Sequence, residues 1–543
     1  MGSMASQRPW QEIAAAKKAE QSSRIPAEWK LSDKALKAAE TTVDLRPIAA
    51  TCGILTEKEV EITEKYDATE LAAEIAKGSY SAVEVTTAYC KRAAVAQQLL
   101  SCLTEIRFLE AIEDAKKLDE EFKRTGKPIG RLHGVPMTCK ECFHFKGFDS
   151  SNAYITRCFD PATYDSYLIQ LMKAEGAIFV AKTNIPQSML AAEAHNNVFG
   201  QTKNPVVSHL NPGGSSGGEG SVLAFNGSAL GIGTDVAGSI RCPCAANGVY
   251  GFKPSFGMYP MIYYAASNWV GMNTGIPAVC GPMGHSMRDL ILWHRVVRDA
   301  KPWLFDPSLV PEQTKPNVSD RRPVVGVFFQ SGGLKPHPPI IRAINEAVEK
   351  LKAAGFEIKE FTPPDFNEMR DISHELLSLD GLSYAKGEME KAGEPPVESV
   401  LKSGFWDKSR KTWEEAWVFN SKKIAWQKQM LDAWQKANVD VVLGPAGPHT
   451  AVTPNEWTNF SYTVAWNAVD YPALIIPFTT VDPEKDPRDT SFTPQSELDK
   501  DNEAMYDAQK MAGAPVALQI AGPRLADEQL LKDVELIDSV LNL

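Results

Sequence analysis

Two glycine- and serine-rich segments stand out in this sequence as candidates for chemistry. Residues 213–220 read Gly-Gly-Ser-Ser-Gly-Gly-Glu-Gly, and residues 231–241 read Gly-Ile-Gly-Thr-Asp-Val-Ala-Gly-Ser-Ile-Arg. Glycine at this density costs conformational entropy on folding, so it needs a physical reason. One such reason is backbone that points several N–H donors at a developing negative charge. A flexible linker is the alternative, but the neighbouring Phe225, Leu230 and Ile232 are apolar and argue against it.

A lysine upstream of these segments is the third candidate. Lys140 ends the short apolar stretch Gly134-Val-Pro-Met-Thr-Cys-Lys. Most lysines at such a place are exposed to solvent. A buried lysine would lose its proton readily, because burial disfavours the ammonium form. A neutral amine of this kind is a competent base for a serine hydroxyl.

The composition excludes several classes of protein. The chain has 543 residues, and 57 Lys and Arg against 68 Asp and Glu give a formal net charge of −11. A nucleic-acid-binding protein would need a cationic surface instead. No apolar run approaches the roughly 20 residues that span a bilayer, and no secretory segment begins the chain. Nine cysteines in such a chain indicate free thiols, so we expect a cytoplasmic protein without a nucleic-acid partner or a transmembrane anchor.

Alternating strands and helices must position the three candidate segments. Residues 177–181 and 230–233 are short apolar runs between turns, which is typical of central strands. Residues 324–329, 339–354 and 357–361 predict a strand–helix–strand unit. Further strands are expected at 439–443 and 513–522, and helices at 68–77, 81–98 and 527–541. The alternation predicts an α/β fold with a large mixed, mostly parallel sheet covered by helices on both faces.

The chain divides into two expected parts. Residues 1–65 read as an N-terminal helical arm, and residues 66–543 as the catalytic domain. Within the second part, residues 482–503 are charged and proline-containing, which predicts a solvated loop. Residues 405–434 hold five of the twelve tryptophans at helical spacing. These tryptophans predict helices that pack over the core. The alternatives are the entrance to a substrate site, a membrane-contacting surface or a dimer surface, and the last of these keeps a homodimer among the alternatives.

Several longer motifs occur in a fixed order along the chain. They are Gly134-Val-Pro with Lys140, Lys182–Met189, Phe199–Pro205, the two Gly/Ser segments, Gly251–Ser255 and Pro515–Gly522. By these motifs the chain resembles the amidase signature family, in the branch that holds fungal acetamidases and fatty acid amide hydrolase. The resemblance covers residues 66–543. It implies the large mixed sheet of that family and an amidase activity.

The resemblance also implies a Ser–cisSer–Lys triad. Carried over to this sequence, Ser239 is the nucleophile, Ser215 the bridging residue and Lys140 the base. The two serines lie 24 positions apart, as in the family. The family's cis peptide bond falls at Gly214–Ser215. The expected enzyme is a serine hydrolase that cleaves a small-molecule carboxylic amide through an acyl-enzyme, with no cofactor and no metal, and its activity should fall at acid pH as Lys140 takes up a proton.

Other residues receive roles from the same resemblance. The family's oxyanion hole is made of backbone N–H groups of the loop before the nucleophile, here Val236, Ala237, Gly238 and Ser239. Met189 falls where the fatty acid amide hydrolase branch contacts its substrate. We interpret Asp235 and Arg241 as a structural pair that fixes the loop, in preference to substrate contacts. Ser216 is expected to support the loop by hydrogen bonding, and Glu219 to be structural.

Two features depart from the family's usual sequence. Ala237 stands where the family has a glycine. If this position needs a positive φ, alanine strains the backbone; if it does not, the methyl group only narrows the pocket. Four cysteines lie close to the candidate segments: Cys139, Cys142, Cys242 and Cys244. A zinc site is an alternative, but the ligand spacing is imperfect, and buried free thiols are the expectation.

Competing functions stay open at this stage. Residues 213–217 also fit the nucleophile elbow of α/β-hydrolases, with Ser215 as nucleophile and His374 or His449 as base. On the family scaffold, an amine that intercepts the acyl-enzyme would make an amide synthase or cyclase. An amidotransferase subunit would share the core but need protein partners. A non-catalytic binding protein is a further alternative, although all three triad residues are present.

Overall fold

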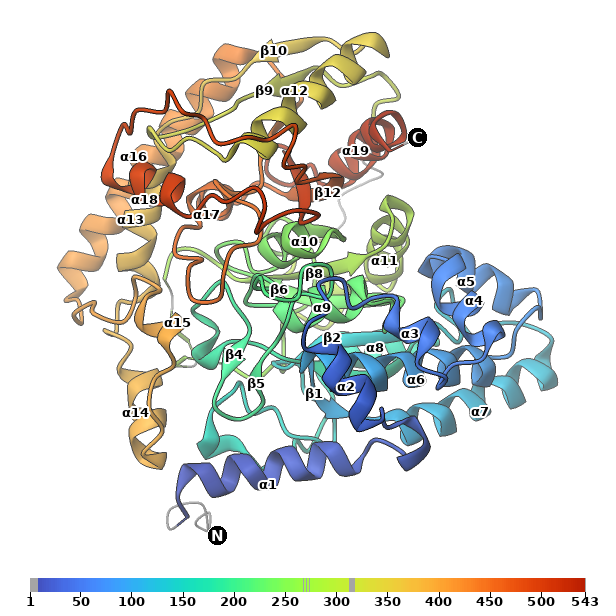
Figure 1. The fold of residues 1–543 in the computed structure, drawn as a ribbon. Helices are drawn as coiled ribbons and strands as arrows, with labels where there is room; N and C mark the ends of the chain where they lie inside the picture. The colour runs from blue at the N-terminus through green and yellow to red at the C-terminus, as the bar shows by residue number, and fades with distance from the viewer. Residues whose placement is uncertain (1–7, 267, 270, 273, 312–317, 543) are drawn as a thin grey trace.

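A mixed eleven-stranded sheet runs through the centre of the molecule (Figure 1). We describe it from a computed structural model that covers residues 8–266, 268–269, 271–272, 274–311 and 318–542. In spatial order the strands are β1 (Leu103–Ile106), β3 (Ile178–Thr183), β2 (Pro136–Lys140), β6 (Leu230–Asp235), β8 (Val279–Gly284), β7 (Tyr250–Lys253), β12 (Ala473–Thr480), β13 (Pro515–Ala521), β11 (Val441–Pro445), β9 (Val325–Val327) and β10 (Ile358–Glu360). A separate small sheet pairs β4 (His195–Asn196) with β5 (Gly200–Gln201).

The mixed sheet is confirmed, but its parallel share is smaller than predicted. Parallel pairing is confined to β3–β2–β6 and to β11–β9–β10. The other six pairings in the described sheet are antiparallel. A parallel neighbour needs a crossover over one face of the sheet, whereas an antiparallel one needs only a return of the chain. The alternation of elements predicted several of the strands, but not β1, β7 or β8, and not which strands would become neighbours.

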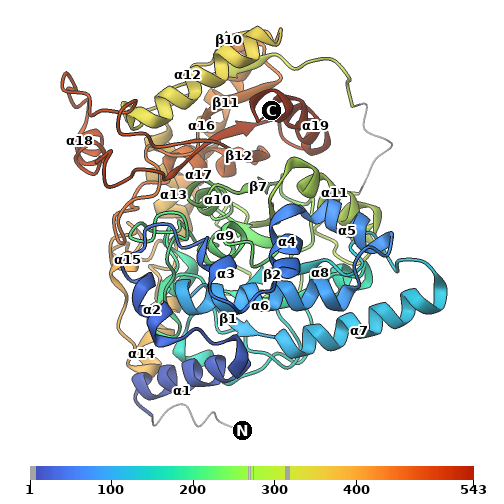
Figure 2. The same cartoon turned by 45° about the vertical axis from the view of Figure 1, so that its right-hand side comes forward.

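Helices surround the sheet, as predicted (Figures 1 and 2). Helices α9 and α10 pack on each other and on β6, β7 and β12, whereas α11, α12 and α19 form another group against β7, β8 and β13. The helices of this part are α5 (Ala68–Ala76), α6 (Ala82–Leu100), α7 (Phe108–Thr125), α8 (Tyr167–Ala174), α9 (Gly217–Ala224), α10 (Arg241–Asn247), α11 (Met287–Asp299), α12 (Pro338–Ala353), α13 (Phe366–Leu377), α14 (Ser383–Ala392), α15 (Glu398–Leu401), α16 (Trp413–Ala437), α17 (Ser461–Ala468), α18 (Glu497–Ala504) and α19 (Asp527–Leu541). No described helix has the length and apolar character needed to cross a membrane.

Local signals set several of these helix boundaries. Helix α6 begins after Ser81, whose hydroxyl accepts from the N–H of Glu84 while the Glu84 carboxylate returns a bond to Ser81. This reciprocal arrangement satisfies two N–H groups that a helix start leaves unpaired. Helix α18 was wrongly predicted as loop within 482–503. Ser496 caps it, and acidic residues in its first turn suit the positive end of the helix dipole.

Of the residues that we expected to form an N-terminal arm, those that the structure describes contain four α-helices. The arm contains α1 (Trp10–Ser23), α2 (Asp33–Ala39), α3 (Ile48–Thr51) and α4 (Glu57–Lys65). Apolar side chains from its connecting segments, among them Trp29 and Leu45, share one buried cluster with residues of α6, β1 and β3. The arm therefore adds to the core beside the strands that carry the candidate site.

The tryptophan-rich segment splits into two environments on α16. Trp426 and Trp434 are 0% and 8% exposed and pack in the core with Phe366 and Phe361. Trp413, the first residue of the helix, and Trp417, about one turn later, are 76% and 64% exposed. The packing interpretation is therefore confirmed for the C-terminal half of the helix, and its N-terminal half presents apolar side chains to solvent.

Candidate active site

The three candidate segments meet at one edge of the sheet. Lys140 is the last residue of β2, and Asp235 is the last residue of β6. These strands are parallel neighbours, with Cys139 opposite Ile232. Because parallel strands end at the same edge, the loops that follow them lie together. Ser215 lies just before α9, which packs across both strands.

Lys140 and Ser215 are in direct contact. The Lys140 Nζ atom lies 2.6 Å from the Ser215 Oγ atom and 2.7 Å from the Thr234 Oγ1 atom. Lys140 is fully buried, and Ser215 is 2% exposed. Burial lowers the pKa of Lys140 from 10.5 to about 8, because the buried ammonium form is poorly solvated. This amine is therefore far easier to deprotonate than an exposed lysine.

Thr234 is a contact that the sequence reasoning missed. It lies within the second Gly/Ser segment, one residue before Asp235, and nothing in its local pattern distinguishes it from other strand residues. Its hydroxyl reaches Lys140 only because β2 and β6 pair in parallel. A lysine amine held by two hydroxyls has its position defined without the ion pair that would keep it charged.

Ser239 approaches the same place from the loop after β6. The backbone N–H of Ser216 donates to the Ser239 carbonyl at 3.1 Å, which ties the two serine segments together. Ser239 and Gly214 line the same pocket. The peptide bond between Gly214 and Ser215 is cis, at the position that the family resemblance implied. In the described part of the chain, the Ser215 and Ser239 hydroxyls make no hydrogen bond to each other.

Asp235 and Arg241 hold the loop between β6 and α10. The Asp235 carboxylate accepts from the N–H groups of Gly238 and Ile240 at 2.8 and 3.1 Å, and pairs with Arg241 at 3.0 Å. Both side chains are fully buried. Burial alone would raise the pKa of Asp235, but the Arg241 guanidinium holds it well below its usual range. These contacts hold the Asp235 and Arg241 side chains together beneath the loop.

Arg241 also connects this loop to the C-terminal half of the chain. Its guanidinium donates to the Thr463 carbonyl at 2.9 Å, to Gln519 at 2.8 Å and to Asn467 at 2.6 Å. Thr463 and Asn467 lie on α17, and Gln519 lies on β13. The loop is thus braced by segments more than 200 residues away in sequence.

The geometry of the loop corrects one expected oxyanion donor. The N–H of Gly238 donates to Asp235, so it is not free to bind a substrate oxygen. The N–H groups of Val236, Ala237 and Ser239 have no such internal partner among the described residues. These three N–H groups, and not that of Gly238, are the candidates that the geometry leaves for an oxyanion.

The alanine that departs from the family pattern is tolerated by this loop. Gly238 has a φ of +128°, and a Cβ atom there would lie 2.3 Å from the Thr463 Oγ1 atom. Ala237 is not among the residues with positive φ, and its carbonyl accepts from the Thr463 hydroxyl at 2.6 Å. Only the neighbouring position requires glycine, so Ala237 introduces no backbone strain.

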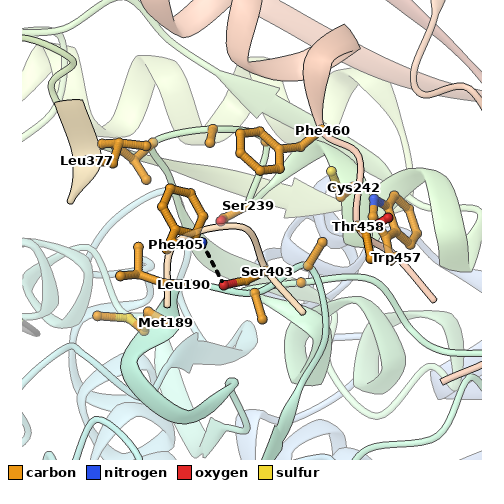
Figure 3. Close-up of a pocket in the computed structure, with 16 residues that line it drawn as sticks. Met189, Leu190, Ser239, Cys242, Leu377, Ser403, Phe405, Trp457, Thr458 and Phe460 are labelled. Carbon is orange, nitrogen blue, oxygen red and sulfur yellow. Dashed lines mark hydrogen bonds between the residues drawn. The ribbon is translucent and has the colours of Figure 1, made fainter. Parts of the chain in front are cut away.

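A small apolar pocket lies over Ser239 (Figure 3). Its volume is about 40 Å³, which gives room for about three water molecules. Figure 3 shows the Ser239 hydroxyl beside the rings of Phe405 and Phe460. These two rings stack with centroids 5.7 Å apart and planes inclined by 13°. Met189, the expected substrate contact, also lines the pocket.

Much of the pocket wall comes from residues that sequence reasoning did not select: Leu190, Leu377, Ser403, Phe405, Trp457 and Phe460. They follow Ser239 by more than 130 positions, except Leu190, and they carry no motif of their own. The only signal was the expectation of a substrate mouth near residues 405–434, and of that segment only Phe405 lines the pocket.

Ser216 and Glu219 support the site from α9 and its N-terminal loop. The Ser216 hydroxyl lies 3.4 Å from both the N and O atoms of Thr234. The buried Glu219 carboxyl accepts from Thr138 at 2.7 Å and from Thr183 at 3.0 Å. Burial raises the pKa of Glu219 to about 8. Both residues therefore connect the serine segment to the strands around Lys140.

The nucleophile-elbow alternative lacks its histidine. Among the described contacts, the Ser215 side chain bonds to Lys140, and neither proposed histidine reaches it. The His374 ring packs against Phe405 and Phe460, and the His449 Nδ1 atom is 2.8 Å from the Thr450 carbonyl. The cysteines near the site are free and buried, and no group of three or more metal-ligating side chains occurs within the described residues.

Comparisons with known proteins agree with this geometry. The sequence profile of the Amidase family matches residues 84–531. The acetamidases of Aspergillus oryzae and Emericella nidulans are each 33% identical to this chain, covering 98% of it and 99% and 98% of their own lengths. A solved structure of a fatty acid amide hydrolase superposes with a TM-score of 0.91 at 30% identity, covering 99% of this chain and 96% of that one.

The buried Asp235–Arg241 pair allows a test of the loop's stability. We expect Arg241→Met to lower the free energy of unfolding by about 3–5 kcal/mol, because it leaves a buried carboxylate without its partner. Urea denaturation measures this change. Arg124→Met is the matched control, since Arg124 forms an exposed ion pair with Glu121 and should leave the unfolding midpoint unchanged. Equal midpoints for the two variants would contradict the bracing role.

Proposed function

The chain belongs to the amidase family and is an amide hydrolase, and we propose that it cleaves its substrate through an acyl-enzyme formed on Ser239. The observation that carries this mechanism is the 2.6 Å contact between the buried Lys140 amine and the Ser215 hydroxyl. A serine hydroxyl is a weak nucleophile until a neighbouring base takes its proton. In this proposal Ser215 takes that proton and passes its own proton to Lys140.

The first half of the reaction forms the acyl-enzyme. The Ser239 Oγ atom attacks the amide carbonyl, Ser215 takes the proton of Ser239, and Ser215 passes its own proton to Lys140. The carbonyl oxygen becomes an oxyanion that the N–H groups of Val236, Ala237 and Ser239 stabilise, with each donor worth about 3–4 kcal/mol. Protonated Lys140 then returns a proton through Ser215 to the nitrogen, which leaves as amine or ammonia.

The second half releases the acid. Water attacks the acyl-enzyme carbonyl and gives up a proton through Ser215 to Lys140. The tetrahedral intermediate collapses with expulsion of the Ser239 oxygen, which regains its proton. The same three side chains act in both halves, so no other titratable group is required.

The pocket favours a short, uncharged acyl group. All the residues that line it are uncharged, and its volume of about 40 Å³, room for about three water molecules, favours a short acyl group. Burying a charged substrate group among such residues without a partner would be costly. The names of the two fungal relatives, both acetamidases, support the same substrate class.

The cytoplasm is the location that we propose for this enzyme. All nine cysteines are free, and eight of them are buried. Free thiols persist in reducing compartments, whereas oxidising compartments convert accessible pairs to disulfides.

Covalent labelling tests the nucleophile. A fluorophosphonate probe should label the parent protein once, at Ser239, because the probe resembles the tetrahedral intermediate. Ser239→Ala should abolish both labelling and amide hydrolysis, as read by mass spectrometry and product assay. Ser403→Ala is the control, since Ser403 lines the same pocket but has no contact with Lys140 among the described residues. Labelling of Ser215 in the Ser239→Ala variant would instead favour the nucleophile-elbow mechanism.

The pH profile tests the base. A neutral amine is required, so kcat/KM should rise with pH through the pKa of Lys140, near 8, and fall on the acid side as the amine takes up a proton. Lys140→Ala should lose at least about 100-fold in rate and this pH dependence. The exposed Lys146→Ala is the matched control and should keep the parent profile. An unchanged profile in Lys140→Ala would refute the assignment.

A panel of amides tests the substrate class. The panel runs from acetamide and propionamide to hexanamide and oleamide. We expect kcat/KM to fall by about tenfold or more once the acyl chain is longer than the pocket, because one extra methylene in an apolar pocket already changes kcat/KM by about that factor. Phe405→Ala should reduce this discrimination by enlarging the pocket. If oleamide were hydrolysed as fast as acetamide, the short-acyl proposal would fail while the nucleophile assignment stood.

A further inference from the structure

A buried network of five charged side chains connects the N-terminal arm to the strand that ends at Lys140. We call it the buried charge network; its members are Lys17, Glu105, Asp149, Lys182 and Glu141. Their side chains are between 0% and 4% exposed. The network lies outside the reaction described above, and none of its members lines the pocket over Ser239.

Lys17 enters this network from helix α1. Its Nζ atom lies 2.7 Å from Glu105 and 2.7 Å from Asp149, and Glu20 of the same helix adds a third carboxylate at 2.9 Å. Helix α1 is also docked by Gln21, whose side-chain amide donates to the Leu103 and Thr104 carbonyls on β1 at 2.8 and 2.9 Å. Figures 1 and 2 show α1 along the lower edge of the molecule.

The remaining members continue the network to β2. The Lys182 Nζ atom donates to the Asp149 carbonyl at 2.5 Å and to Ser150 at 2.8 Å, and it lies 3.4 Å from the Glu141 carboxylate. Glu141 accepts from Thr104 at 2.5 Å and from the N–H of Ser151 at 2.8 Å.

Three neighbouring strands meet in this network. Glu105 lies on β1 and Lys182 on β3, and Glu141 directly follows Lys140 at the end of β2. The register places Lys140 opposite Thr183, the residue after Lys182. A shift of any of these side chains would therefore be transmitted to the end of β2.

The charge balance makes Lys17 important. With Lys17 and Lys182 charged and the carboxylates of Glu105, Asp149 and Glu141 ionised, the network has a net charge of −1. Without Lys17 the other four groups would carry −2. A buried carboxylate that loses its partner is strongly destabilised, and it must be neutralised or hydrated at the expense of packing. Lys17 is thus the cation that lies against both Glu105 and Asp149 and offsets their charge.

We propose that Lys17 is a positioning residue for Lys140: from the N-terminal arm it neutralises the buried carboxylates that hold the ends of β1, β3 and β2 in register. This inference rests on the proposed role of Lys140 as the base. In this proposal the N-terminal arm contributes to catalysis and not only to the stability of the fold. Lys17 itself touches no reacting atom, so its effect on the rate is exerted through the placement and the electrostatic surroundings of Lys140.

Methionine substitution tests the proposal. Lys17→Met should lower kcat/KM by about tenfold or more, as small displacements of catalytic groups do. The hydration that relieves the unpaired carboxylates should also reduce the burial of Lys140, which raises its pKa toward 10.5 and moves the acid limb of the pH profile upward. Glu219 and Asp235, the other carboxyl groups near Lys140, are unchanged in this variant. Lys18→Met, the exposed neighbour on α1, is the control and should match the parent.

A compensating variant separates positioning from simple loss of stability. Lys17→Met/Glu105→Gln restores the net charge of −1, so it should recover most of the rate, the parent acid limb and the soluble fold. If Lys17→Met lowers the melting temperature but keeps the parent pH profile and rate, the positioning role is overturned. If the double variant fails to recover the soluble fold or the parent pH profile, the claim that Lys17 acts by neutralising charge is overturned. If the parent protein showed no loss of kcat/KM at acid pH, the assignment of Lys140 as the base would fail instead.

Discussion

The desolvation of one amine is the constraint on which the rest of this site depends. Lys140 is fully buried at the end of β2, and its hydrogen-bond partners are the hydroxyls of Ser215 and Thr234. Burial without a directly paired carboxylate destabilises the ammonium form, and the pKa falls from 10.5 to about 8. A lysine can then serve where many hydrolases use histidine. The surrounding sheet must exclude water for this to work, which accounts for the burial of β2 and β6 on both sides.

The second requirement is a rigid loop opposite that amine. The loop from Val236 to Ser239 is irregular, and irregular backbone holds its N–H groups in place only when other groups define its shape. The Asp235 carboxylate binds the N–H group of Gly238 in this loop and that of Ile240 just after it, and Arg241 connects that carboxylate to α17 and β13. This bracing uses the N–H of Gly238, whereas those of Val236, Ala237 and Ser239 have no hydrogen-bond partner among the described residues. Stability of the loop and availability of donors are thus set by the same hydrogen bonds.

The shared fold and the lining of the pocket depend on different residues of this protein. The chain superposes closely on a fatty acid amide hydrolase, and its pocket over Ser239 has a volume of about 40 Å³ and is bounded by the stacked rings of Phe405 and Phe460. The shared scaffold positions the reacting groups, whereas the residues around the pocket decide what fits. The buried charge network adds a third level, since it ties the N-terminal arm to the strands behind Lys140.

Residue type and periodicity singled out the Gly/Ser segments, Lys140 and several of the surrounding elements, and the family resemblance implied the roles of the reacting residues. The Gly/Ser segments, Lys140, helices such as α12 and α19, and the strands β6 and β13 follow from residue type, capping and periodicity, which act over a few neighbouring residues. Tertiary structure alone decided which strands pair and in which direction, so it supplied the Thr234 contact and reduced the parallel share of the sheet. It also took the Gly238 N–H out of the oxyanion set and brought Phe405 to the pocket. These outcomes depend on contacts between segments that are far apart along the chain, and no local pattern encodes such a contact, because burial and pairing are properties of the packed molecule.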